Sequence, residues 1–206
     1  DKVKGLCITH GHEDHIGAIP YILKQINMPI YATKLTNGLI ENKLKEHGML
    51  RTVKRKVVKY GQSINLGCFR IEFIKTNHSI QDAAALALFS PAGIVVHTGD
   101  FKVDYTPVFG DAIDLQRFGE IGKKGVLALL CESTNAERSG FTPSEKTVGR
   151  VFDNLFSEYS DTRIIIATFA SNVDRVQQII NSAHKYGRKV VVEGRSMVNV
   201  IATASE

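Results

Sequence analysis

The feature that most constrains this sequence is the segment His10-Gly-His-Glu-Asp-His15, which packs three histidines and an aspartate into six residues. Neutral imidazole nitrogens and carboxylate oxygens are ordinary zinc ligands, and this density is enough for more than one ion. A closely spaced pair of metal ions is a known device for hydrolysing phosphate esters. A single histidine here would more often be a helix cap or a surface group. The full set favours a metal site, with His10, His12, Asp14 and His15 as ligands.

The flanking residues predict where this segment lies in the fold. Val3–Thr9 is typical of a buried strand, and residues 16–26 carry apolar side chains at helical spacing. Loops between such elements often carry the chemistry of a protein on a rigid scaffold. The sequence therefore predicts a metal-binding turn between a strand and a helix.

Four ligands from one turn cannot complete two metal sites, so further ligands must come from the ends of other strands. His78 follows a predicted strand at 69–75, and Asp100 follows another at 94–98. Each has an ordinary alternative when taken alone, as a polar loop histidine and as a turn aspartate after glycine. Because both come just after a strand, as His10 does, one sheet edge would bring all of them together.

The composition is that of a globular protein with an ample core, with 43% hydrophobic and 23% charged residues in 206. No apolar run approaches the roughly 20 residues of a membrane span, so no membrane association is expected. Cys7, Cys68 and Cys131 lie in apolar, strand-like runs. We expect buried, reduced thiols, as in a cytoplasmic protein.

A formal net charge of +5 favours polyanionic partners without identifying one. Part of this charge is concentrated in the segment 51–59, which holds five basic residues. These side chains are compatible with an RNA path, and equally with a solvated edge strand protected by lysines. Both interpretations stay open at this point.

The remaining predicted elements divide the chain into two parts that differ in their order of strands and helices. Up to residue 141 we expect a strand at 29–32, a helix at 34–47 closed by Gly48, strands at 53–60 and 69–75 joined by a turn region at 61–67, a strand pair at 83–89 and 94–98, a helix at 114–121 and a strand at 126–131 buried on both faces.

The second part begins at a capping-box pattern, Thr142-Pro-Ser-Glu145. Helices are expected at 144–159, at 172–186 and from 196 onward, with strands at 163–169 and 189–193. Alternating strands and helices indicate parallel strands joined by right-handed crossovers. We therefore predict one domain over residues 1–141 and the start of a doubly wound α/β domain over residues 142–206.

The order His-x-His-x-Asp-His, then His78, then Thr-Gly-Asp100 resembles the metallo-β-lactamase superfamily. The resemblance implies a four-layer αββα sandwich with metals at the edge shared by its sheets. It also implies that His10, His12 and His78 hold one zinc ion and that Asp100 bridges to a second. The second ion would be held by Asp14, His15, Asp100 and one further histidine.

Later segments are similar to the β-CASP nucleases, specifically to the ribonuclease J family. They are Leu130-Cys-Glu-Ser-Thr-Asn135, Ala167-Thr-Phe-Ala-Ser-Asn172, Gly194-Arg-Ser-Met197 and His97-Thr-Gly-Asp-Phe-Lys102. The resemblance implies a ribonuclease that uses two zinc ions to hydrolyse RNA phosphodiester bonds in RNA processing and decay, with 5′-3′ exonuclease and endonuclease activity. It further implies an RNA substrate with a 5′-monophosphate end and a homo-oligomer or paralogue complex in the intact protein.

Roles for individual residues follow from the resemblance and from local chemistry. Asp14 and Asp100 would bind metal and orient the attacking water or accept its proton. Glu132 would be the acidic β-CASP residue that steers a general-acid histidine, with a salt-bridged surface glutamate as the alternative.

The helix starts at Ser171–Asn172 and Arg195–Ser196 present backbone N–H groups suited to RNA phosphates, and Phe169 is suited to stacking on a base. The alternatives are that Ser171 is only a helix cap and that Phe169 is a core residue.

The chain opens with Asp1 and ends inside a predicted helix, so we expect an internal fragment of a longer protein. On that expectation the family's leading strands lie upstream, its later histidines lie downstream, and the fragment alone is inactive. Two other functions stay under consideration. One is a small-molecule metallohydrolase of the same superfamily, although such enzymes typically lack a second α/β domain. The other is a non-catalytic RNA-binding subunit, which the intact set of ligands disfavours.

Overall fold

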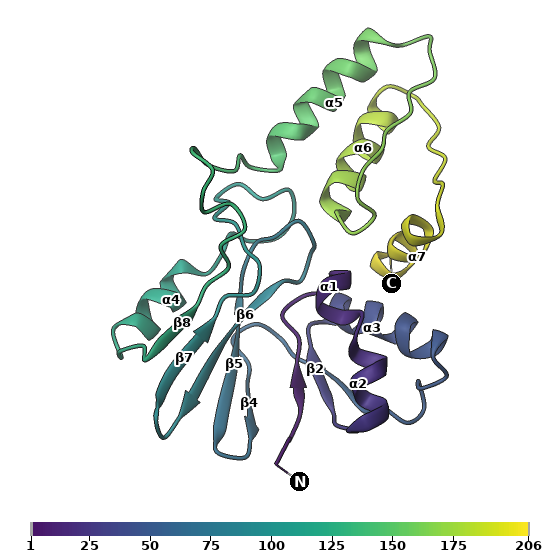
Figure 1. Ribbon diagram of the computed structural model, residues 1–206. Coiled ribbons are helices and arrows are strands. Elements are labelled where there is room, and N and C mark those ends of the chain that lie inside the picture. The colour runs from purple at the N-terminus through teal and green to yellow at the C-terminus, as the bar shows by residue number, and fades with distance from the viewer. Residues whose placement is uncertain (1, 206) are drawn as a thin grey trace.

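The computed structural model describes residues 2–205, and two β-sheets form its centre (Figure 1). The first sheet has the order β1-β2-β3, and all of its strands are parallel. The second has the order β4-β5-β6-β7-β8, antiparallel except for the parallel pair β7–β8. The strands are β1 (Leu6–Cys7), β2 (Ile30–Ala32), β3 (Arg55–Val57), β4 (Ser63–Leu66), β5 (Phe69–Lys75), β6 (Ala84–Ser90), β7 (Gly93–His97) and β8 (Ala128–Leu130).

Helices cover the outer face of each sheet, which gives the predicted αββα layers. The helices α1 (Glu13–Ile16), α2 (Ile19–Gln25) and α3 (Lys34–Glu46) lie on the first sheet, and α4 (Leu115–Gly122) lies on the second (Figure 1). Three apolar clusters fill the interfaces between the layers. Ile30 and Leu44 belong to the first, Phe73 and Leu86 to the cluster between the sheets, and Ile121 to the third.

The helix expected over residues 16–26 forms over Ile19–Gln25 as α2, but it does not extend back to Ile16, which ends the separate short helix α1. Pro20 explains the break: it has no N–H, and inside a continuous helix its ring would clash with the carbonyl of Ile16. By contrast, α3 ends as predicted, because Gly48, which follows the C-cap residue His47, takes a positive φ of 68°.

The segment at 61–67, expected to be a turn region, contains the strand β4. Gly61 and Gly67 both adopt positive φ angles, 74° and 63°, so the chain reverses at either end of the segment. This allows Ser63 to pair with Glu72 and Leu66 with Phe69. The preceding strand β3 pairs with β2 in the other sheet.

Strand β8 is not buried on both faces, contrary to the prediction from its apolar sequence. Leu129 is 60% exposed and Leu130 is 54% exposed. The strand lies at the edge of its sheet, next to β7 alone, so the described residues leave these side chains uncovered.

The second part of the chain forms the helices α5 (Lys146–Glu158), α6 (Val173–Lys185) and α7 (Arg195–Ala204). Phe152 and Phe156 of α5 pack with Ala183 of α6. Within residues 2–205 the expected strands at 163–169 and 189–193 do not form, because neither segment has a hydrogen-bonded neighbour strand. Helix α5 also begins later than the capping-box pattern predicts, with Glu145 as its N-cap.

Three further predictions concern the surface. None of the described helices combines the length and apolar character of a membrane span. The cysteines are unpaired, but Cys68 and Cys131 are exposed, so the expectation that all three are buried is wrong. The basic strand β3 lies at a sheet edge, where Arg55 pairs with Glu41 at 2.6 Å, which supports the edge-strand interpretation of that segment.

A buried ion pair fastens α4 to the second sheet. The Nε and Nη2 atoms of Arg117 donate to the two carboxylate oxygens of Glu72 on β5, at 2.6 and 2.9 Å. The Glu72 side chain is only 5% exposed, so it depends on this partner for its charge.

We therefore expect Arg117→Met to lower the free energy of unfolding by about 2 kcal/mol, because it removes both hydrogen bonds to a buried carboxylate and leaves Glu72 with only the more distant guanidinium of Arg70, at 3.7 Å. Urea unfolding at pH 7 measures this effect. The control is Glu120→Gln, which removes an exposed partner of the same guanidinium and should change the urea midpoint little. Equal midpoints for the two variants would contradict a stabilising role for the buried pair.

Candidate metal centre

The first ligand of the candidate site, His10, is completely buried three residues after the end of β1. Its Nδ1 lies 3.0 Å from the hydroxyl of Thr9, and its Nε2 is buried without a hydrogen-bond partner. A metal-binding histidine ordinarily donates its other ring N–H to such an oxygen, which leaves the second nitrogen free to bind the ion. A buried polar atom without a hydrogen-bond partner is unfavourable, so the Nε2 of His10 is suited to binding a metal cation.

The loops after β5 and β7 bring two further ligands to this nitrogen. The Nε2 atoms of His10, His15 and His78 lie 3.8, 3.5 and 3.7 Å from Oδ2 of Asp100. The Nε2 of His78 lies 3.1 Å from the Nδ1 of His12. Two nitrogens bound to one tetrahedral zinc at its usual bond lengths are roughly 3.3 Å apart. The spacing of the side chains therefore fits a metal ion.

The ligand atoms form two groups that share one carboxylate. His10, His12, His78 and Asp100 make the first group, and Asp14, His15 and Asp100 make the second. Within each group all ligand atoms lie within 4.8 Å of one another. Residues 2–205 contain no other group of this kind. The structure thus gathers all six side chains that the sequence nominated, from three segments of the chain.

Burial keeps the histidines of the first group neutral. It lowers the pKa of His10 to about 2, with the nearby imidazoles of His15, His78 and His12 lowering it further. Burial, followed by the charge of His12, lowers the pKa of His78 to about 4, and burial also lowers the pKa of His12. Neutral imidazoles are the form that binds a metal ion, so the site needs no deprotonation at pH 7.

Close contacts between loops fix these ligands. Gly99 has a φ of 59°, and a Cβ atom there would lie 2.9 Å from the Cβ of Thr9. Only glycine therefore allows the Asp100 loop to approach the end of β1 so closely. Asp82 also has a positive φ of 64°, and its Oδ2 accepts a hydrogen bond from the N–H of Leu35 at 2.9 Å. That bond fastens the loop after His78 to the start of α3.

Three residues that support the ligands were not predicted from the sequence. Thr9 holds His10, the hydroxyl of Ser79 lies 3.5 Å from Nε2 of His12, and Asp82 holds the loop. A polar Thr9 at the end of an apolar strand was a signal that could have been used. The other two depend on contacts between distant parts of the chain.

Glu132 lies beside the metal centre, just after β8. It lines an open cleft together with Asp100, Gly99 and His97. Its backbone N–H donates to the Thr98 hydroxyl at 3.2 Å, and its Oε2 accepts from the N–H of Thr134 at 2.9 Å. Among the described residues it forms no ion pair, so the alternative of a salt-bridged surface glutamate receives no support.

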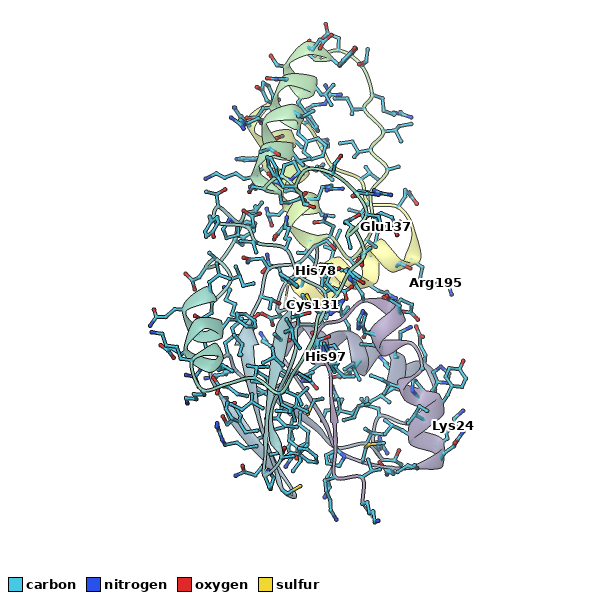
Figure 2. The ribbon with its side chains drawn as sticks, turned by 60° about the vertical axis from the view of Figure 1, so that its left-hand side comes forward. Lys24, His78, His97, Cys131, Glu137 and Arg195 are labelled. Atoms are coloured by element: carbon cyan, nitrogen blue, oxygen red, sulfur yellow. The ribbon has the colours of Figure 1, made fainter. Side chains whose placement is uncertain are left out.

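The residues nominated for RNA binding differ in their accessibility. Phe169 is 80% exposed, so its alternative as a core residue is wrong. Asn172 is buried, and its Oδ1 caps α6 by accepting from the N–H of Arg175. Ser171 is half-buried, whereas Arg195 and Ser196 are exposed at the start of α7. Figure 2 shows Arg195 at the edge of the molecule, apart from His78.

A family model described as the metallo-β-lactamase superfamily matches residues 1–125. The chain belongs to the metallo-β-lactamase superfamily. This membership agrees with the αββα layers and with the position of the His/Asp cluster where the ends of strands from both sheets meet. A second family model, described as the β-CASP domain of ribonuclease J, matches residues 161–206.

Curated relatives extend the similarity over the whole chain. Ribonuclease J of Synechocystis sp. is 50% identical over 99% of the chain, which covers 32% of that protein. Ribonuclease J of Helicobacter pylori is 48% identical over 100% of the chain and 30% of its own length, and ribonuclease J2 of Bacillus subtilis is 41% identical over 99% and 37%. The predicted resemblance is confirmed, and the chain spans about a third of the length of these relatives.

A solved structure supports the fold independently. A protein of unknown function from Enterococcus faecalis superposes with a TM-score of 0.68 at 20% sequence identity. The alignment covers 97% of this chain and 48% of that one. At this identity the match supports the arrangement of the elements and carries no statement about activity.

The lowered pKa of His78 predicts a pH dependence for the stability of the metal-free protein. The unfolded chain binds a proton near pH 6.5, whereas the folded protein resists it until about pH 4. Stability should therefore fall as the pH decreases from 6.5 toward 4. His78→Gln should make that fall shallower in urea unfolding with a chelator present. His184→Gln, an exposed control outside the cluster, should leave the slope unchanged, and equal slopes for both variants would contradict the prediction.

Proposed function

We propose that the intact protein is a zinc-dependent ribonuclease that hydrolyses RNA phosphodiester bonds, with 5′-3′ exonuclease and endonuclease activity. The observation that carries the proposal is the paired set of ligand atoms around Asp100, together with the unpartnered Nε2 of buried His10. The similarity to proteins named ribonuclease J supports RNA as the substrate. Residues 1–141 would form the metal-binding domain, and residues 142–206 would begin the β-CASP domain.

The six clustered side chains would hold two zinc ions. His10, His12 and His78 would hold the first ion, Asp14 and His15 the second, and Asp100 would be shared. When bound, zinc supplies a hydroxide nucleophile at neutral pH and offsets charge on the phosphate oxygens. Asp14 is exposed, so its carboxylate is free to reach both an ion and a water molecule.

Three acidic residues would direct the proton movements. Asp100 and Asp14 would orient the attacking water and accept its proton, because Asp100 belongs to both ligand groups and Asp14 belongs to the second. Glu132 would orient a proton-donating histidine of the full-length protein toward the leaving oxygen. Its place in the open cleft beside Asp100 supports this role.

The RNA would run from the metal centre toward α6 and α7. Exposed Phe169 would stack on a base, and Arg195 would make a forked contact with phosphate. The N–H groups near Ser171, Asn172 and Ser196 would favour an anion such as a 5′-monophosphate end. Unpaired cysteines fit a cytoplasmic protein, and a homo-oligomer or paralogue complex is part of the proposal for the intact protein.

We expect Asp100→Ala in the full-length protein to reduce cleavage of a 5′-labelled RNA by more than about 100-fold. It should also reduce the bound zinc, because both ligand groups lose their shared oxygen. A gel assay and metal analysis measure the two effects, with His47→Gln, outside both groups, as the control. Retention of full zinc by the Asp100 variant would refute the shared role.

Hydrolysis of a thioester instead of RNA by the unmodified protein would favour a small-molecule hydrolase, and RNA binding without zinc would favour a non-catalytic subunit.

Phe169→Ala should weaken binding of single-stranded RNA by about 5- to 100-fold, because a stacked base contributes about 1–3 kcal/mol. The cleanest measurement is the dissociation constant in the catalytically inactive Asp100→Ala background at fixed salt. Phe141→Ala provides a matched control, because that ring is 88% exposed and belongs to none of the segments assigned to the RNA. Equal losses from both substitutions would argue against a specific stacking role for Phe169.

A further inference from the structure

Two ligands of the metal centre, His78 and Asp100, lie on loops outside the N-terminal turn, and these two loops are joined to each other. The N–H of Lys102 donates to the carbonyl of Asn77 at 2.7 Å, in an isolated antiparallel bridge. Asn77 immediately precedes His78, and Lys102 is two residues after Asp100. A shift of either loop is therefore transmitted to both ligands.

Both loops also reach the second part of the chain. Gln81, three residues after His78, donates its amide N–H to Oδ1 of Asp174 on α6. Asp104, four residues after Asp100, accepts from the backbone N–H of Glu145 at 3.2 Å. The Nζ of Lys102 lies 3.4 Å from Oδ2 of Asp104 and 4.0 Å from Oε2 of Glu145. Each ligand loop thus ends in a polar contact with α5 or α6.

These contacts are buried and mutually supporting. Asp104, Glu145 and Asp174 are 3%, 8% and 8% exposed. Arg175 donates from Nε and Nη2 to both oxygens of Glu145, at 2.8 and 3.0 Å, and directly follows Asp174. A forked pair of this kind fixes geometry as well as charge. The start of α5 and the first turn of α6 therefore act as one rigid unit against both loops.

We propose that Glu145, Arg175 and Asp174 are positioning residues for the metal centre. Through Gln81 and the pair Lys102–Asp104, they set where His78 and Asp100 stand relative to the His10–His15 turn. The α-helical second part then contributes to metal binding as well as to RNA contact. This inference rests on the metal centre of the proposed function, and it does not depend on RNA being the substrate.

The test measures zinc affinity of the full-length protein by competition with a chromogenic chelator. Gln81→Ala and Glu145→Gln should each raise the zinc dissociation constant by about 10-fold, the lower end of the loss seen when a partner of a metal ligand is removed, because neither residue contacts a ligand directly. The visible spectrum of the cobalt-substituted protein should change in both variants, which a general loss of stability would not produce. Gln81→Ala is the milder change and keeps the test decisive where Glu145→Gln impairs folding.

Asp153→Asn is the matched control. Asp153 also joins α5 to α6, through Ser182 at 2.7 Å and Lys185 at 2.6 Å, but neither partner lies on the ligand loops. Its zinc affinity and cobalt spectrum should match those of the unmodified protein. Zinc affinities for Gln81→Ala no weaker than for Asp153→Asn would overturn the inference. Tight zinc binding without RNA cleavage by the unmodified protein would instead refute the proposed function alone.

Discussion

The structure depends on one unusual arrangement, the complete burial of the His10 imidazole with one ring nitrogen unpartnered. An unsatisfied buried polar atom costs about 1–3 kcal/mol, so a fold keeps one only where something else compensates for it. Here a bound metal cation would compensate. The Nε2 atoms of His10, His15 and His78 all lie within 4 Å of the same Asp100 oxygen, so the other ligands of such a cation are already close. The cluster is therefore intelligible as a cation site whose ligands are already in place, and it is hard to explain as a packing feature.

Bringing the other ligands to that nitrogen requires both sheets. His10 is carried by β1 of the first sheet, whereas His78 and Asp100 follow β5 and β7 of the second. The sheets must therefore pack with their strand ends aligned, which the apolar cluster around Phe73 achieves. Gly99 then allows the last approach, because a side chain at that position would collide with Thr9. The Glu72–Arg117 pair holds the outer helix α4 on the same β5 that leads to His78.

The sequence was most informative where structure is local. His10–His15 predicts its own turn because its ligands are neighbours, and the end of α3 was predictable from Gly48. Pairing between distant segments was harder to predict from the sequence. No local pattern near residues 61–67 indicates that β4 pairs with β5 while β3 joins the other sheet. For the same reason, the apolar run of β8 predicted burial that its edge position does not give. The supports of the ligands, such as Asp82, depend on equally distant contacts.

The division between local and distant ligands has an energetic consequence. The turn holds four ligands whenever β1 and α1 are formed, but His78 and Asp100 join only when their loops are held. Metal ions held by all six side chains would stabilise every contact that holds those loops, since binding to the folded state alone shifts the folding equilibrium. With the loops fastened to Glu145 and Asp174, this linkage extends to α5 and α6. Because such coupling is reciprocal, a ligand that binds only when α5 and α6 are ordered would tighten metal binding by the same factor by which the metal tightens binding of that ligand.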